Sequence, residues 1–206
     1  MLGSPGLGTR APVLARRCLR VAEQRVGRHT GGMALDMHTD EQLRIVPYDP
    51  AWPARFMSEK ELLEDAIGQR VTGGIHHVGS TAVPGLAAKP VIDVLVGVED
   101  LPSSRASFHQ LAKLDYHYAP YRSEEMHWFC KPSPAHRTHH LHMVPTASHR
   151  YRAELAFRDA LRVRPDLAKR YEALKYELAA RYRNDREAYT EAKHDFIAEV
   201  LALSAS

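Results

Sequence analysis

A group of residue types that could handle phosphate stands in the stretch 76-HHVGSTAVPGLAAKPVIDVLV-96. Gly79, Ser80 and Thr81 form a turn after an apolar segment, and such a turn offers backbone N–H groups and hydroxyls to a phosphate. Asp93 stands inside the β-branched run that follows, where a carboxylate is costly to bury unless it is paired or bound to a metal. We therefore predict that the turn holds a phosphate and that Asp93 binds a divalent cation beside it.

The alternative for Asp93 is a structural aspartate that pairs with nearby Lys89 or with an arginine. The turn is not a Walker A loop, because five residues separate Gly79 from Gly85 and no Gly-Lys-Ser/Thr follows. The segment also has too few glycines for a dinucleotide-binding loop.

A second group is the histidine-rich stretch 136-HRTHHLHMV-144. On a strand, His140 and His142 face one side of the sheet and His139 faces the other. Two histidines on one face can ligate zinc, manganese or iron, or bind phosphate when protonated. We predict that both are catalytic residues and metal ligands. The alternative is a half-buried polar strand face, and a histidine-triad hydrolase would need a further histidine where Thr138 stands.

Basic side chains that could clamp a phosphate form a third group. Its members are Arg137, Arg158, Arg162 and Lys193. Most arginines on helices are solvated, so each taken singly is more simply a surface residue. Lys193 shares a helical face with Tyr189 and is the strongest of the four. With Lys89, it would neutralise the charge that develops on a phosphate during transfer.

The spacing of apolar residues predicts the elements that must position these side chains. The predicted helices cover 53–68, 102–116, 150–165, 165–182 and 186–203, and the predicted strands cover 71–80, 91–98 and 138–145. The segment 117–132 is typical of a hairpin or a strand with its approach. Mixed elements followed by helices alone indicate an α+β fold with a C-terminal helical segment. We expect a single domain over 43–203, with an α/β core at 43–145 and a helical part at 148–203.

Composition bounds the class of protein. The chain is 44% hydrophobic and 26% charged, and it has no apolar run near the ~20 residues that span a bilayer. Cys18 and Cys130 make no disulfide framework, which indicates a reducing, cytoplasmic compartment. The net charge of +3 resides in residues 1–35, where six arginines accompany one glutamate. The remaining chain is close to neutral, so no nucleic-acid partner and no membrane partner is expected.

The basic leader over residues 1–35 is rich in arginine, glycine and proline. We interpret it as a disordered extension or as translated sequence ahead of a true start at Met33. The alternative is a mitochondrial transit peptide, which would change the predicted location from cytoplasmic to mitochondrial.

These segments together resemble the GrpB family from about Ile45 to Leu203. The matching stretches are 48-YDPAWPARF-56, 77-HVGSTAVPGLAAKPVIDVLVGV-98, 138-THHLHMV-144, 157-FRDALR-162 and 186-REAYTEAKHDFI-197. The family is similar to the polymerase-beta-like nucleotidyltransferases, which implies a nucleotidyltransferase-like mixed β-sheet with packed helices. Some members resemble a domain fused to dephospho-coenzyme A kinase.

The nucleotidyltransferase pattern is Gly-Ser followed by two carboxylates that alternate on a strand, with a third from a neighbouring strand. By resemblance, the Gly-Ser turn holds nucleotide phosphates and Asp93 is the first metal ligand. The chain departs from the pattern at Leu95, where the second carboxylate should stand. Two-metal chemistry needs carboxylates that bridge ions ~4 Å apart. The missing metal ligands would have to come from Glu124, Glu125 or the pair His140 and His142. A site that contains histidine favours manganese or zinc over magnesium.

The resemblance implies metal-dependent transfer of a nucleoside monophosphate from a nucleoside triphosphate, or a related small molecule, to an unknown acceptor. The implied cofactor is a divalent metal, either magnesium or manganese, with zinc as a further choice. Two alternatives stay open. One is a non-catalytic protein that binds a nucleotide or a coenzyme A-related ligand, which Leu95 favours. The other is a histidine-dependent metal phosphoesterase. The sequence does not indicate an oligomeric state.

Overall fold

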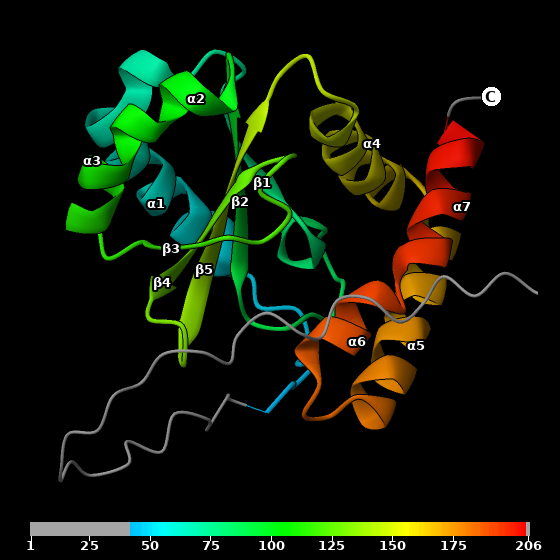
Figure 1. Cartoon of the computed structure of the whole chain (residues 1–206). Helices are drawn as coiled ribbons and strands as arrows, with labels where there is room; N and C mark the ends of the chain where they lie inside the picture. Colours follow the sequence, from blue (N-terminus) through cyan, green and yellow to red (C-terminus); the bar gives the residue numbers. More distant parts are fainter. Residues whose placement is uncertain (1–41, 205–206) are drawn as a thin grey trace, which may run out of the picture. The chain divides into compact units, whose positions relative to one another are not determined.

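The centre of the fold is a mixed sheet in the order β1-β2-β5-β4-β3. The computed structural model describes residues 42–204 (Figure 1). The strands are β1 (Ile75–Val78), β2 (Ile92–Val98), β3 (His117–Ala119), β4 (His127–Pro132) and β5 (Arg137–Pro145). The two central strands, β2 and β5, run parallel, and the other neighbours are antiparallel. This architecture confirms the expected α+β class.

The register of the central pair decides which side chains share a face. Asp93 on β2 lies opposite His140 on β5, and Leu95 lies opposite His142. Because side chains alternate along a strand, these four point to the same side of the sheet. The prediction that His140 and His142 share a face is confirmed.

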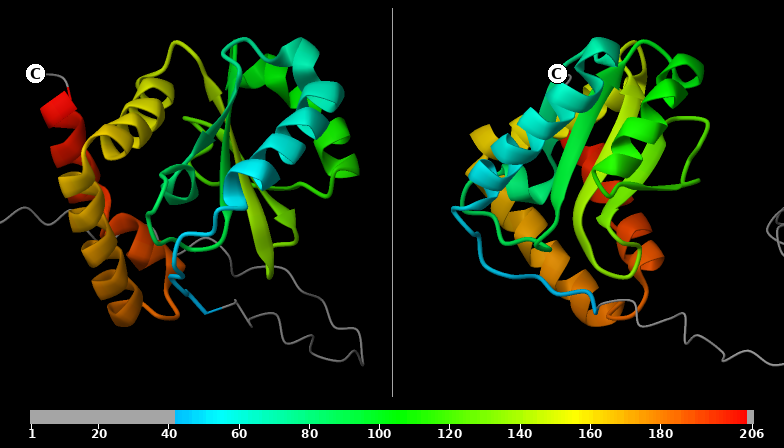
Figure 2. Two further views of the ribbon diagram at one scale, coloured as in Figure 1. Left: turned by 180° about the vertical axis from the view of Figure 1, so that it is seen from behind. Right: turned by 90° about the vertical axis from the view of Figure 1, so that its left-hand side faces the viewer.

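One face of the sheet is covered by α1 (Trp52–Ile67) and α3 (Phe108–Lys113) (Figure 2). Helix α1 begins beside a proline in its first turn, where a missing N–H costs nothing. It buries an apolar stripe against the sheet, and Leu63 and Val94 are fully enclosed there. At about 25 cal/mol per Å² of apolar surface, such burial is the main force that holds the helix on the sheet.

The other face is covered by the C-terminal helices. These are α4 (His149–Val163), α5 (Pro165–Arg181), α6 (Arg186–Glu191) and α7 (His194–Ser204). Tyr151 of α4 packs against Leu95 and Val78. The segment after β1 begins with a 3-10 turn, η2 (Ser80–Ala82), and its Val83 packs with apolar residues of α4, α5 and α7.

Two predicted helices are broken in the structure. The segment 102–116 forms α2 (Leu101–Ser104), the 3-10 turn η3 (Arg105–Ser107) and α3, and a further short turn, η1 (Gly68–Arg70), follows α1. Asp100 caps α2, because its side chain accepts from the N–H of Ser103 at 2.7 Å. The segment 186–203 is interrupted between α6 and α7, and Lys193 lies in that break.

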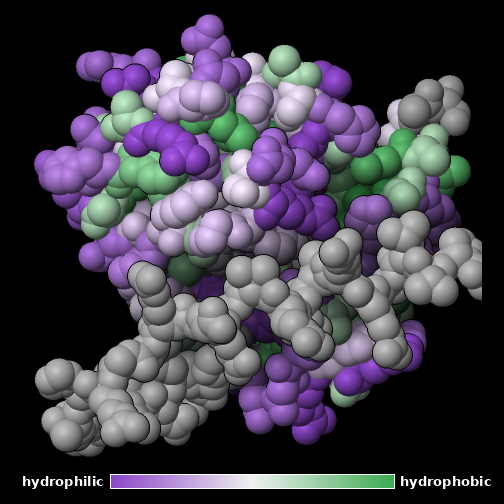
Figure 3. Space-filling model, in the orientation of Figure 1, coloured by the Kyte–Doolittle hydropathy of each residue, from purple (hydrophilic) through white to green (hydrophobic). Residues whose placement is uncertain are grey.

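The expectations for residues 1–35 lie outside the described residues. Among residues 42–204, no helix is long and apolar enough to cross a membrane. Hydrophilic residues predominate on the face drawn in Figure 3, with hydrophobic side chains gathered in smaller areas between them.

A buried ion pair joins α1 to β4 on the face opposite Asp93. Glu59 is only 4% exposed, and both of its carboxylate oxygens lie 2.9 Å from the Nζ of Lys131. His139 Nε2 lies 3.8 Å from the same carboxylate. His139 therefore points to the face opposite His140 and His142, as predicted. Removing one partner of such a pair leaves an uncompensated charge in the interior.

We therefore expect Lys131→Met to lower the free energy of unfolding by about 3 kcal/mol. Urea denaturation measures this directly. Lys60→Met is the matched control, because Lys60 makes an exposed pair with Glu64 at 3.5 Å and should cost under ~0.5 kcal/mol. Equal losses in the two variants would contradict the assignment of a buried, tightly paired Glu59.

Candidate active site

Asp93 and His140 form a hydrogen-bonded pair at the centre of the sheet. Asp93 Oδ1 lies 3.0 Å from Nδ1 of His140. Burial raises the pKa of Asp93, but the hydrogen bond and charge of His140 outweigh this and leave the pKa lowered. Burial lowers the pKa of His140. An ionised carboxylate can only accept, so Nδ1 carries the proton and Nε2 is an acceptor. That Nε2 is buried and has no hydrogen-bond partner among residues 42–204.

His142 and Glu154 repeat this arrangement beside the first pair. His142 Nδ1 lies 3.0 Å from Oε2 of Glu154, which α4 supplies. Burial lowers the pKa of His142, but the charge and hydrogen bond of Glu154 raise it further than burial lowers it. Arg150 Nε lies 2.9 Å from the other oxygen of Glu154. Glu154 is a residue that sequence reasoning missed, because nothing in its helical context marks it as a partner of a strand histidine.

The Gly-Ser turn reaches Asp93 through its glycine. Gly79 has a φ of +70°, and a Cβ there would lie 2.9 Å from Cγ of Asp93 and closer still to Oδ2. Only glycine combines this backbone conformation with such a close approach. The turn and the carboxylate are therefore in contact.

Thr81 holds the turn in place through its buried hydroxyl. Its Oγ1 donates to the carbonyl of Val91 at 3.2 Å and lies 3.0 Å from His77 Nε2. The threonine proton is engaged, so His77 Nε2 must donate and its Nδ1 is unprotonated. Thr81 is 1% exposed. We assign it to shaping the turn, while Ser80 at the start of the turn is partly exposed and faces the phenol of Tyr171.

The C-terminal helices bring a lysine to the same region. The Nζ of Lys193 lies 4.3 Å from the centre of the Tyr189 ring, so the predicted contact exists although the helix is broken between them. Burial lowers the pKa of Lys193 to about 8, against the opposing effect of the Asp93 charge. Lys193 in turn helps to lower the pKa of Asp93. A cation is thus within electrostatic reach of the Asp93–His140 pair.

A second lysine of this region was not singled out in the sequence. Lys175 on α5 is 2% exposed and donates to the carbonyl of Ala87. Burial lowers its pKa to about 7. A lysine at helical spacing gives no sign of burial in a sequence, because most lysines are solvated.

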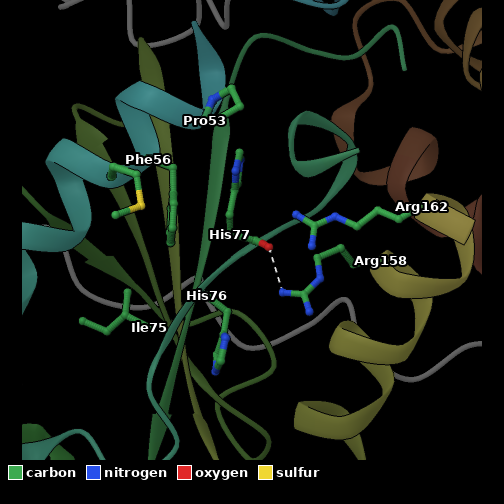
Figure 4. Close-up of a pocket in the computed structure, with 8 residues that line it drawn as sticks. Pro53, Phe56, Ile75, His76, His77, Arg158 and Arg162 are labelled. Atoms are coloured by element: carbon green, nitrogen blue, oxygen red, sulfur yellow. Dashed lines mark hydrogen bonds between the residues drawn. The ribbon is translucent and has the colours of Figure 1, made fainter. Parts of the chain in front are cut away.

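The other predicted basic residues lie at different distances from this centre. Lys89 is close enough for its charge to lower the pKa of His140. Arg137 stacks over the Trp128 ring at 5.4 Å, and that ring lies 5.0 Å from the His140 ring. Arg158 and Arg162 belong to a separate pocket at the outer edge of β1 (Figure 4).

The donor set near Asp93 is poor in carboxylates. Leu95 is fully buried in an apolar cluster, so β2 supplies no second acid. Glu125, considered as a helper, instead accepts from Arg150 Nη1 at 2.7 Å, and Glu124 is exposed. Within the described part of the chain, no three His, Cys, Asp or Glu side chains are grouped so as to hold a metal ion. A metal at Asp93 would therefore need most of its ligands from a substrate or from water.

Comparison with known proteins gives the family. A model of the GrpB protein family matches residues 42–203, so the chain belongs to the GrpB family. It is 41% identical over 168 residues to the UPF0157 protein PA4798 of Pseudomonas aeruginosa, which covers 79% of this chain and 67% of that protein. The crystal structure of conserved protein GrpB from Enterococcus faecalis matches with a TM-score of 0.70 and 31% identity, over 78% of this chain and 96% of that one.

A further match covers less of the chain. A dephospho-CoA kinase of Mycolicibacterium paratuberculosis is 35% identical over 94 residues, which is 44% of this chain and 23% of that protein. The family resemblance drawn from the motifs is confirmed. The link to polymerase-beta-like nucleotidyltransferases stays a prediction.

The buried His77 should make stability depend on pH. Burial lowers its pKa to about 4, whereas the ordinary value is 6.5. Between these values the unfolded chain takes up a proton that the folded chain does not, so stability falls as the pH falls, by at most ~1.4 kcal/mol per pH unit. We expect His77→Gln to flatten this dependence between pH 6.5 and 4.5 in urea denaturation. The exposed His117, replaced in the same way, should leave the slope unchanged; an unchanged slope in His77→Gln would refute the assignment.

The close approach of Gly79 to Asp93 can be separated from backbone strain by a pair of substitutions. Gly79 and Gly85 have similar φ values, +70° and +77°, but a Cβ on Gly85 would meet nothing within 4 Å. Gly85→Ala should cost about 1–2 kcal/mol from the left-handed conformation. Gly79→Ala should cost ~1–3 kcal/mol more, because the carboxylate must move. Equal unfolding free energies for the two variants would show that Gly79 does not touch Asp93.

Proposed function

We propose that the chain binds a nucleoside triphosphate beside Asp93 and transfers its nucleoside monophosphate to an acceptor hydroxyl. The observation that carries the proposal is the Asp93–His140 pair. A carboxylate holds the imidazole at Nδ1 and leaves Nε2 buried and without a partner among the described residues. A proton acceptor in this state, beside a Gly-Ser turn and the partly buried Lys193, is suited to activate a hydroxyl against a phosphate.

The transfer step assigns each group one task. The acceptor oxygen forms a bond to the α-phosphorus, the bond from that phosphorus to the bridging oxygen breaks, and pyrophosphate leaves. The acceptor proton passes to Nε2 of His140, and Asp93 stabilises the imidazolium that results. Lys193 and the backbone N–H groups at Gly79 and Ser80 balance the negative charge that moves onto the leaving phosphates.

A divalent metal would enter this site with the nucleotide. Magnesium is commonly bound through one or two carboxylates together with substrate phosphates, and Asp93 Oδ2 is the oxygen available here. Such an ion, magnesium or manganese, would supply charge neutralisation to the phosphates when bound. The buried Leu95 leaves no bridging carboxylate on β2, so the site supports one ion at most on this strand.

Two observations favour the other functions. The same absence of a second acid at Leu95, with the match to a protein named dephospho-CoA kinase, supports non-catalytic binding of a nucleotide or a coenzyme A-related ligand. The carboxylates on Nδ1 of His140 and His142 support a metal phosphoesterase, because metal-ligating histidines usually donate their other N–H to a carboxylate. In that case the Nε2 atoms of His140 and His142 would coordinate zinc or manganese.

The first test is a panel of nucleoside triphosphates and coenzyme A, each with magnesium, manganese or zinc, followed by thermal unfolding. A ligand that binds only the folded chain raises the unfolding midpoint. The stabilising pair is then supplied with α-labelled nucleotide and a pool of small-molecule and protein acceptors. We expect label to reach an acceptor, and we expect His140→Gln to slow this by about 100-fold or more.

His139→Gln is the matched control, because it is the same change one residue away on the opposite face of the sheet. It should leave transfer nearly unchanged. Stabilisation without transfer, equal in wild type and His140→Gln, would support the binding function instead. Hydrolysis without an acceptor that depends on both His140 and His142 would support the phosphoesterase. If no nucleotide–metal pair raises the midpoint, the nucleotide proposal is wrong.

A further inference from the structure

A pocket lies at the outer edge of the sheet, and neither Asp93 nor His140 lines it. Its volume is about 280 Å³, and it opens between β1, α1 and α4. Figure 4 shows Arg158 and Arg162 reaching from α4 toward β1, with Phe56 and Ile75 on the other side. The proposed function uses none of these residues.

Each nitrogen of the Arg158 guanidinium donates a hydrogen bond to a protein partner. Its Nη1 donates to the carbonyl of His77 at 3.2 Å (Figure 4). Its Nε and Nη2 donate to the two oxygens of Asp159 at 2.7 and 3.0 Å. Both oxygens of that carboxylate therefore accept from Arg158, and Asp159 makes only a longer contact, at 3.8 Å, with the second guanidinium, that of Arg162.

Arg162 is anchored at one end and open at the other. Its Nε donates to the carbonyl of Ala82 at 2.9 Å. Its Nη1 lies 3.8 Å from Asp159, and neither terminal nitrogen donates a hydrogen bond to a residue in 42–204. The side chain is 39% exposed, so the fork faces the pocket. Two guanidinium groups share one carboxylate here, which leaves an uncompensated positive charge.

The opposite wall of the pocket is mostly apolar. The rings of Phe56 and His77 stack at 4.8 Å with an angle of 9° between their planes. Ile75 and Met57 continue this wall, and Met57 is 49% exposed. His77 is neutral at physiological pH, because burial lowers its pKa to about 4. The wall therefore adds no charge of its own.

We infer that this pocket binds a small organic oxyanion, a carboxylate or phosphate carried on an aromatic or aliphatic body. The terminal nitrogens of Arg162 form a fork that matches two oxygens of such a group. The wall of Phe56, Ile75 and Met57 buries the body of the ligand. The pKa of Arg162 is lowered by burial and by its neighbour Arg158, and a bound anion would relieve both effects.

Phenyl phosphate and benzoate serve as probes. Phenol, which lacks the charge, and inorganic phosphate, which lacks the aromatic ring, are the comparison compounds. Calorimetric titration should show saturable binding of at least one charged aromatic probe and weaker binding of both comparison compounds. The better of the two charged probes identifies the preferred oxyanion. We expect Arg162→Gln to weaken that binding about tenfold or more, as loss of a charge-assisted contact does.

Arg164→Gln is the control of equal charge, because Arg164 is two residues away, 51% exposed and paired with Asp166 at 2.8 Å. It should bind the probe as the wild type does. A second readout uses the unaltered chain with labelled methionine methyls. The ring of the probe should shift the Met57 resonance, assigned through Met57→Leu, and leave the fully buried Met143 unmoved. The inference would be overturned if no probe bound saturably, or if both arginine variants weakened binding equally. It would also be overturned if the Met57 resonance did not shift when the probe was added.

Discussion

The parallel pairing of β2 with β5 is the constraint on which the candidate active site depends. Its register sets Asp93 opposite His140, so a carboxylate in the middle of the sheet finds a hydrogen-bond partner at 3.0 Å. An unpaired carboxylate there would carry a heavy desolvation cost. The same register sets Leu95 opposite His142, and Leu95 then contributes to the apolar contact with α4. A shift by one residue would turn Asp93 into the core beneath α1 and destroy both arrangements.

The sheet, its flanking helices and the face shared by the histidines could be predicted, because all three follow from local periodicity. The strand 91–98 is a continuous apolar run, and alternation alone places His140 and His142 together. The breaks at 105–107 and 192–193 could not be predicted in this way. Each interrupts a stretch whose apolar spacing remains helical, and packing against other elements decides where the turn falls.

The candidate site was predictable mainly in the residues of the Gly-Ser turn and of the two central strands. Gly79, Ser80 and Asp93 stand close together in the chain, and their types point to phosphate and metal chemistry. Glu154 could not be found, because it reaches His142 only after α4 folds back over the sheet. Lys193 could be predicted in part. Its contact with Tyr189 was expected from helical spacing, yet the fold achieves it across a helix break. Long-range packing supplies what local patterns omit.

The two arginines of α4 show why residue type alone could not assign a role. Arg158 and Arg162 are one helical turn apart, carry the same charge and anchor carbonyls on either side of the same turn, those of His77 and Ala82. A single carboxylate separates their roles. Asp159 accepts two hydrogen bonds from Arg158 but lies 3.8 Å from Arg162, whose terminal nitrogens donate to no residue in 42–204, so one arginine is structural and the other is available to a ligand. Because both arginines brace the turn that contacts Asp93, an anion that draws Arg162 away from Ala82 would loosen one support of the candidate active site. The turn that contacts Asp93 is therefore a structural element common to both sites.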